Sequence, residues 1–203
     1  MQIQLSILLV LSATALLSQD IPTLTTRVFE YSGEQPGDIS NMCSLGCAIG
    51  WDLTTSSFLA AQGSNVYDAN RIDDGHPSTA WIEGRKGLGI GEKITFHFPA
   101  HYFTEGHIKD SINFDGFRIL NGYQKDSLTW LANSRVKRLR VYHNQEPICD
   151  ILVSDSMLMQ EVDDHPLCHI KPGDTITVQI REVFRGKRYE DTAISELIPL
   201  GAH

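Results

Sequence analysis

The residues from Asp74 to Glu92, DGHPSTAWIEGRKGLGIGE, bring together ligand-type oxygens, an aromatic side chain and several glycines. Asp74 and Thr79 lie beside Gly75 and Pro77, which permit and stiffen a tight turn. Carboxylate, hydroxyl and backbone oxygens are the ligands that Ca²⁺ prefers, in sets of about six to eight. The segment is too polar and too rich in glycine for a core helix, and its composition is typical of a binding loop.

A second chemistry that these residue types could perform is sugar recognition. An aromatic ring packs on the C–H surface of a pyranose while planar polar groups read its hydroxyls. The candidate glycan-binding residues are Trp81, Glu83, Arg85, Asn121, Tyr123 and Arg135. For Trp81 the alternative is a plug at the end of a β-sandwich, and Trp51 and Trp130 are expected to pack in the core or at its rim.

Catalytic motifs are missing from the sequence. The glycines at 84, 87, 89 and 91 match neither G-x-x-x-x-G-K-[ST] nor G-x-G-x-x-G, so we interpret them as turns. There is no G-x-S-x-G or H-E-x-x-H, and the eight histidines fall in no recognisable triad order. Asp73, Glu83 and Glu92 could pair as in a glycosidase, but spacing in sequence does not establish the separation of their carboxylates. We therefore expect a protein that is not an enzyme.

The elements that must position these residues are predicted to be short strands. Alternation with a period of two places Ile94, Phe96 and Phe98 on one face, and Leu139 and Val141 on another. Such alternation occurs in residues 92–99, 111–120, 136–143, 149–154 and 174–183. Helical signals are few, with one or two turns expected within 56–72. Short strands between Gly, Asp, Asn and Pro clusters predict an all-β protein, a sandwich or barrel.

The N-terminus predicts secretion. Residues 1–19 contain no charged side chain and include an apolar run that is too short to span a bilayer comfortably, as in a signal peptide; a buried N-terminal strand or helix is the alternative. Residues 20–48, rich in turn residues, are expected to be an arm or linker, and 49–203 one folded domain. No other segment approaches membrane-spanning length.

Four cysteines suit an oxidising compartment. The simplest disulfides are Cys43–Cys47 and Cys149–Cys168, although the sequence allows three connectivities. Cys43, Cys47 and Cys168 with His169 could alternatively bind zinc, but their spacing matches no standard knuckle.

The net charge of -8 argues against a nucleic-acid partner. RVKRLR at residues 135–140 is a local basic exception. On a strand its basic residues fall on both faces, so the simplest interpretation is a solvated strand beside acidic neighbours.

Several segments resemble a known family. AAQGSNVYDANRIDDGHPSTAW contains D-G-x-x-x-T-x-W, and YEDTAISELIPLGA resembles a closing strand with a Ser-Glu pair, as in the discoidin or factor 5/8 type C, galactose-binding-like modules. STAWIEGRKGLGIGEKITFHF, ILNGYQKDSLTWLANSRVKRLRVY and GKRYEDTAISELI are similar to one branch, the NAD glycohydrolase translocation or NADase-type glycan-binding domain. The resemblance runs from about residue 51 to 197 and implies a jelly-roll β-sandwich.

The resemblance also implies a function and a metal site. Members of the family are expected to be non-catalytic modules that bind a glycan or glycoprotein on a cell surface, or that help to carry an attached effector by docking on a protein partner. The module's usual Ca²⁺ site is built from the D-G loop and the final strand, although many relatives of the fold lack calcium. Carried onto this sequence, the ligand set is Arg71, Asp74, His76, Thr79, Ser195 and Glu196. Without metal, Asp74 and Glu196 would simply accept hydrogen bonds from loop amides.

Overall fold

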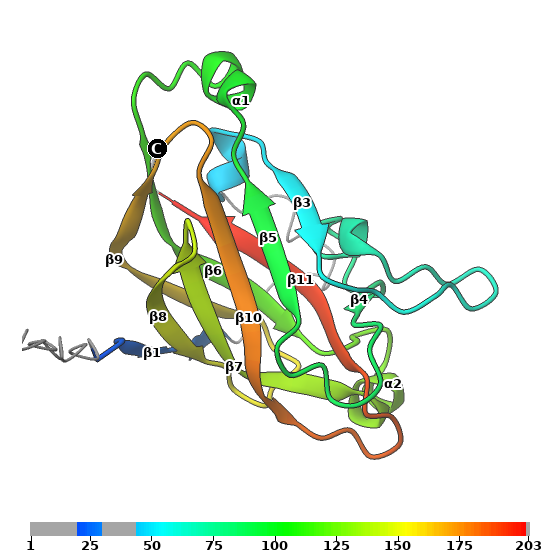
Figure 1. The fold of residues 1–203 in the computed structure, drawn as a ribbon. Coiled ribbons are helices and arrows are strands. Elements are labelled where there is room, and N and C mark those ends of the chain that lie inside the picture. Colours follow the sequence, from blue (N-terminus) through cyan, green and yellow to red (C-terminus); the bar gives the residue numbers. More distant parts are fainter. Residues whose placement is uncertain (1–19, 30–43, 202–203) are drawn as a thin grey trace, which may run out of the picture.

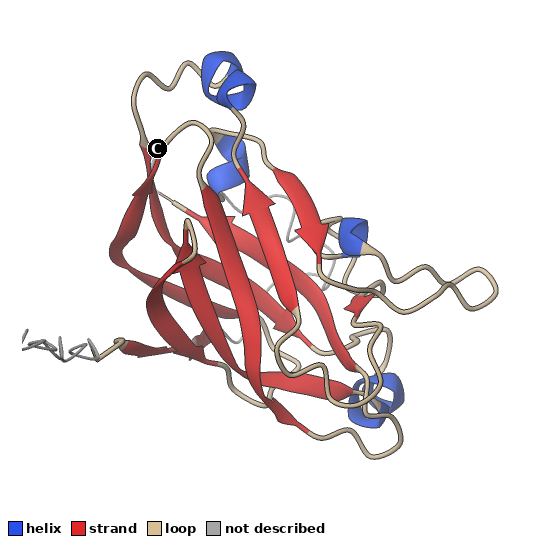
Figure 2. Cartoon of the chain, viewed as in Figure 1, coloured by secondary structure: helices blue, strands red, loops and turns tan. Residues whose placement is uncertain are grey.

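A computed structural model describes residues 20–29 and 44–201, without the side chains of 163–165. The predicted leader, residues 30–43 of the predicted arm, which include Cys43, and the last two residues lie outside the described residues. Eleven strands and a few short helices make up this part of the chain (Figures 1 and 2). The all-β prediction is confirmed, and the predicted jelly-roll sandwich agrees with the strand arrangement.

The strands form two layers that share β11. β2, β9, β6 and β11 are neighbours in one layer, and β1, β8, β7, β10, β5 and β3 in the other. β11 pairs with β6 over residues 196–200 and with β7 at Thr192 and Ala193, so it joins the layers at one end. The strands are β1 (Thr23–Thr25), β2 (Arg27–Val28), β3 (Asp52–Thr55), β4 (Trp81–Ile82), β5 (Lys93–His97), β6 (Ile112–Asn121), β7 (Ser134–His143), β8 (Glu146–Leu152), β9 (Gln160–Ile170), β10 (Thr175–Phe184) and β11 (Thr192–Leu200).

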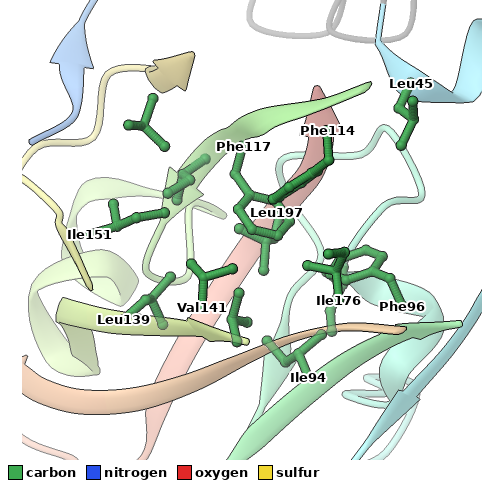
Figure 3. Close-up of a cluster of buried hydrophobic side chains, with 14 of the residues drawn as sticks. Leu45, Ile94, Phe96, Phe114, Phe117, Leu139, Val141, Ile151, Ile176 and Leu197 are labelled. Carbon is green, nitrogen blue, oxygen red and sulfur yellow. The ribbon is translucent and has the colours of Figure 1, made fainter. Parts of the chain in front are cut away.

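The core lies between these layers and comes from the predicted alternation. Ile94, Phe96 and Phe98 are fully buried, as are Leu139 and Val141 on β7. They join one large cluster of aliphatic and aromatic side chains, part of which Figure 3 shows. Burial of alternate residues on both layers is the main stabilising term of such a sandwich.

Beyond the N-terminal arm, alternation did not predict β3, β4, β9 or the two α-helices, and β11 was expected only from the family resemblance. β9 contains Pro166 and a polar run, and its register with β6 shifts between Phe114 and Gly116, so alternation is interrupted. β3 and β4 are too short to show a period. The α-helices α1 (Ala100–Glu105) and α2 (Ser127–Ala132) have six residues each. The helical turn expected within 56–72 is the 3₁₀ helix η3 (Ala69–Arg71).

The N-terminal residues 20–29 add two strands to the sandwich. β1 pairs in parallel with β8, and β2 pairs with β9. A second 3₁₀ helix, η2 (Leu45–Cys47), places Leu45 in the core, where its side chain is fully buried. The predicted boundary at residue 49 stays a prediction.

The basic strand has acidic neighbours, as predicted. Asp150 on β8 accepts from Arg140 at 2.7 Å, and Glu182 on β10 pairs with Lys137 at 2.8 Å and Arg138 at 2.9 Å. No helix among residues 20–29 and 44–201 is long and apolar enough to cross a membrane.

The predicted Cys149–Cys168 disulfide is not formed, because both side chains are thiols in the structure. They lie on β8 and β9, which belong to different layers and do not pair with each other. Burial raises the pKa of each thiol to about 12, so neither is a reactive thiolate near neutral pH. The predicted Cys43–Cys47 pair involves a residue outside the described range.

Candidate functional site

The loop after η3 is organised around the carboxylate of Asp74. One oxygen accepts from the His76 amide at 2.9 Å, and the other from the Arg71 guanidinium at 3.1 Å and the Thr79 hydroxyl at 2.8 Å. Gly75 has a φ of 72°, a conformation in which a residue without Cβ is favoured. The loop is therefore a compact turn closed on one carboxylate.

Strand β11 holds this loop from the other side. The Ser195 hydroxyl donates to the Pro77 carbonyl at 2.9 Å and accepts from the Gln124 amide at 3.0 Å. The Leu197 amide donates to the Ile72 carbonyl at 2.8 Å. Segments separated by more than one hundred residues thus meet, and the six residues of the implied calcium set lie in one region of the fold.

Glu196 has an unusual environment within this region. Its side chain is fully buried, and neither carboxylate oxygen has a hydrogen-bond partner. Burial, followed by the charge of Asp74, raises its pKa to about 8. The amides of Gly75 and His76 lie near enough to lower this pKa somewhat, but they do not form hydrogen bonds of ordinary geometry with it. An unpartnered buried carboxylate facing a second carboxylate fits a cation between them.

The arrangement expected without metal, in which loop groups donate hydrogen bonds to both carboxylates, is present at Asp74 but not at Glu196. No three His, Cys, Asp or Glu side chains gather closely enough to hold a metal within the described part of the chain. A cation here would therefore need hydroxyl and backbone oxygens beside the two carboxylates.

A separate cavity of about 370 Å³ opens at the end of the sandwich where α2 lies. Its walls come from the segment before β4, from α2 and from the β10–β11 connection. α2 and the connection lie close together at the lower right of Figure 1. The lining residues are Leu59, Gln62, Tyr67, Ile82, Tyr123, Leu128, Thr129, Ala132, Asn133, Arg188, Tyr189 and Asp191. This mixture of apolar walls and a few polar groups is typical of small-ligand sites.

α2 begins with a side-chain cap and ends against the β10–β11 connection. The Asp126 carboxylate accepts from the Thr129 amide at 2.6 Å. At the other end, the amides of Arg188 and Tyr189 both donate to the Ala132 carbonyl, at 3.1 and 2.8 Å. These bonds satisfy the last carbonyls of the helix and fix the connection that carries Tyr189 into the cavity wall.

Two tyrosines form the inner wall. The rings of Tyr67 and Tyr123 meet edge to face, with centroids 6.2 Å apart. Neither hydroxyl makes a hydrogen bond to another group of the described chain, although both rings are buried. Tyr189 is 41% exposed at the mouth, where the Arg188 guanidinium lies 5.0 Å from its ring centroid.

The six predicted glycan-binding residues do not form one site. Trp81 is fully buried and donates to the Ser57 carbonyl at 2.9 Å, the plug position that was the alternative. Asn121, also fully buried, bridges the amide and carbonyl of Val136. The Arg135 guanidinium stacks 4.2 Å from Trp130. These side chains have structural partners and no access for a sugar.

The other three candidates lie elsewhere. Tyr123 lines the cavity. Arg85 has an exposed side chain that pairs with buried Glu92 at 2.8 Å. Glu83 is fully buried beneath the glycine-rich loop, where burial raises its pKa to about 7. Asp73, Glu83 and Glu92, which could have paired as in a glycosidase, do not line the cavity.

Sequence reasoning missed Tyr67, Tyr189 and Asp191. The last two stand in GKRYEDTAISELI, which was used only for its resemblance to a closing strand. An aromatic next to acidic residues in the turn before a buried strand was the available signal. Tyr67 had no local signal, since its role depends on a partner 56 positions away in the sequence.

A model of the NAD glycohydrolase translocation F5/8 type C domain matches residues 46–199, most of the chain. The chain belongs to this family. The resemblance seen in the sequence is thereby confirmed, and the NADase translocation domain is a translocation or binding module by type. Among curated proteins none matches the sequence.

Solved structures similar to this NADase translocation domain are distant. A Ruminococcus gnavus GH29 fucosidase in complex with fucose is 15% identical, with a TM-score of 0.46, over 79% of this chain and 27% of that one. CpGH89CBM32-6 from Clostridium perfringens is 11% identical, with a TM-score of 0.41, over 78% and 99%. The mycobacterial arabinofuranosyltransferase AftD is 16% identical, with a TM-score of 0.44, over 73% of this chain and only 10% of its own length.

Proposed function

We propose that this domain is a non-catalytic carbohydrate-binding module, and that the glycan binds in the cavity between α2 and the β10–β11 connection. The observation that carries the proposal is the lining of that cavity. It combines tyrosine rings, two of them with uncommitted hydroxyls, with the amide of Asn133 and the carboxylate of Asp191. Aromatic faces with a few convergent polar groups are what pyranose recognition requires.

The same lining supports a binding role over catalysis. Asp191 is the single carboxylate among the described residues that line the cavity. Glycoside hydrolysis by the usual route needs two carboxyl groups, about 5 to 10 Å apart, on either side of the bond. Glu83 interacts electrostatically with Asp191, but its side chain is fully buried and cannot contact a ligand in the cavity.

We further propose a structural Ca²⁺ between the Asp74 loop and β11. Glu196 and Asp74 would supply carboxylates, Thr79 a hydroxyl, and backbone carbonyls near Arg71, His76 and Ser195 the remaining oxygens. The support is Glu196, whose buried oxygens have no partner. Such an ion would neutralise the two carboxylates and hold the loop to the last strand.

We propose that the protein acts outside the cytoplasm, as a secreted or cell-envelope module. The support is the apolar, signal-peptide-like run within residues 1–19, together with membership in a family expected on secreted proteins. Its binding partner would then be a glycan or glycoprotein on a cell surface.

The second candidate function is docking on a protein partner, as a translocation accessory. It is favoured by apolar side chains around the cavity. Leu128 is 78% exposed, Phe58 is 54% exposed next to lining residue Leu59, and Val66 adjoins Tyr67. An exposed apolar rim of this kind marks an interaction surface.

The experiment that separates these functions is a glycan-array screen of residues 20–203, run with Ca²⁺ and again with EDTA. The test variant is Tyr189→Ala, because this ring is exposed and lines the cavity. Leu158→Ala is the control, since Leu158 is 43% exposed and lies outside the cavity. We expect binding to a coherent set of sugars, reduced about tenfold or more in Tyr189→Ala, as for loss of a stacked aromatic.

Equal sugar binding by Tyr189→Ala and Leu158→Ala would show that the glycan does not bind in this cavity. Failure of folded protein to bind any sugar would reject the glycan function and leave docking on a protein. In that case Phe58→Ala, which leaves the cavity lining intact, should weaken capture of the protein partner.

A further inference from the structure

Asp191 differs from the other acidic side chains near the cavity in lacking a partner. Its carboxylate is half-buried, accepts no hydrogen bond and forms no ion pair with the described residues. Burial and then the charge of Glu190 raise its pKa. By contrast, Glu190 itself pairs with Arg185 at 3.7 Å, and Glu92 with Arg85 at 2.8 Å. A carboxylate left unpaired in a partly desolvated wall favours a ligand that brings a positive charge.

The position of Asp191 is set by backbone contacts. Its carbonyl accepts from the Ser134 amide at 3.0 Å, and the preceding Tyr189 is held by Ala132. The Thr192 hydroxyl beyond it donates to the Leu88 carbonyl at 2.9 Å. The carboxylate therefore stands on a fixed backbone at the cavity wall, and it does not depend on a mobile loop for its placement.

Two further carboxyl groups, those of Glu83 and Glu190, interact electrostatically with Asp191. The Glu83 side chain is fully buried, interacts electrostatically with Asp191, and has one oxygen, Oε1, without a hydrogen-bond partner. Arg188 is the one cation among the described lining residues. Its side chain is exposed and lies over Tyr189, with no ion pair to Asp191. Asp191 is therefore not neutralised by Arg188, and an ammonium group placed beside its carboxylate would be attracted to it.

The aromatic wall has the same preference. The π-faces of Tyr67 and Tyr123 carry partial negative charge, and an ammonium group near such faces is attracted to them. The tyrosine hydroxyls and the Asn133 amide remain to bond ring hydroxyls. The same wall therefore offers aromatic rings that attract a cation and polar groups that can bind sugar hydroxyls.

We propose that the cavity selects a sugar with a free amino group, a de-N-acetylated hexosamine, and that its ammonium group pairs with Asp191. This inference rests on the proposed function, because it names the class of sugar that the cavity takes. An N-acetylated sugar has no positive charge that could pair with Asp191, and the carboxylate of an acidic sugar is repelled by the Asp191 carboxylate.

The test is calorimetric titration of residues 20–203 at neutral pH with two tetrasaccharides. One is the glucosamine tetramer, and the other is the corresponding N-acetylglucosamine tetramer. We expect the glucosamine tetramer to bind about tenfold tighter or more, as for a hydrogen bond to a charged partner. Asp191→Asn should abolish this preference while leaving the melting temperature unchanged.

The matched control is Glu190→Gln, which removes the same charge one residue away, from a side chain that is 62% exposed and does not line the cavity. It should keep the preference, which separates a specific ion pair from general attraction to an acidic protein. Equal affinity for both tetramers, or equal effects of the two substitutions, would overturn the inference while the glycan function stands. Absence of binding to every sugar in the array would overturn both.

Discussion

Glu196 is a buried carboxylate near Asp74, and its protonation couples the proposed calcium site to stability. Its pKa is about 8 in the folded protein against an ordinary value of 4.5. The folded state therefore holds a proton that the unfolded state releases between these values. Without metal, the free energy of unfolding should fall by about 1.4 kcal/mol per pH unit across that window, on top of other titrations. Urea unfolding in EDTA between pH 4.5 and 8.5 measures this slope.

Variants separate the contributions of Glu196 and Glu83 to the slope of unfolding free energy against pH. Glu83, with a pKa of about 7, contributes in the same direction but only up to that pH. Glu196→Gln should therefore flatten the curve between pH 7 and 8, whereas the exposed Glu190→Gln should not. Because Ca²⁺ requires the ionised carboxylate, the rise in melting temperature caused by millimolar Ca²⁺ should be larger at pH 8 than at pH 5 and absent in Glu196→Gln. No rise at pH 8 in the wild type would contradict the calcium proposal.

The β10–β11 connection is the element on which the cavity depends, and Gly186 lets it approach α2. A Cβ at this position would overlap the Ala132 carbonyl oxygen and the Asn133 backbone. Gly186→Ala should therefore displace the connection, cost about 1 to 3 kcal/mol, and shift the amide resonances of Tyr189 and Asp191 in an ¹⁵N spectrum. Gly63→Ala is the control, because Gly63 has open space around it and a φ of 64°, so only local backbone strain is added. Unshifted resonances in Gly186→Ala would show that this contact does not position the cavity wall.

At the scale of the whole molecule, the N-terminal residues connect both layers. The Pro22 carbonyl accepts from Asp150 on β8, and the Thr26 hydroxyl donates to Gln160 on β9. Protein beginning at residue 49 lacks these bonds and the buried Leu45. It should lose at least about 3 kcal/mol, or about 6 to 12 °C in melting temperature, relative to protein beginning at residue 20. Equal melting temperatures by calorimetry would support the sequence-based boundary at residue 49.

Much of the fold could be predicted because alternation is a local property. Each strand with a clear period of two, such as the one carrying Ile94 and Phe96, shows its buried face in its own residues. β9 could not be predicted in this way, since its pairing with β6 includes a register shift and a proline. The residues around Asp74 could be grouped with Ser195 and Glu196 only through resemblance to a family, because the two segments lie far apart in the chain.

The cavity shows the limit of the sequence most clearly. Residue type alone made Trp81, Asn121 and Arg135 suitable for sugar binding, yet each is buried with structural partners. Tyr67, Tyr189 and Asp191 became candidates only when three connections met at one end of the sandwich. By itself the sequence determined the all-β class, the inward faces of the main strands and the family. The tertiary structure decided which polar and aromatic side chains remain accessible, because burial and hydrogen bonding depend on partners distant in the chain.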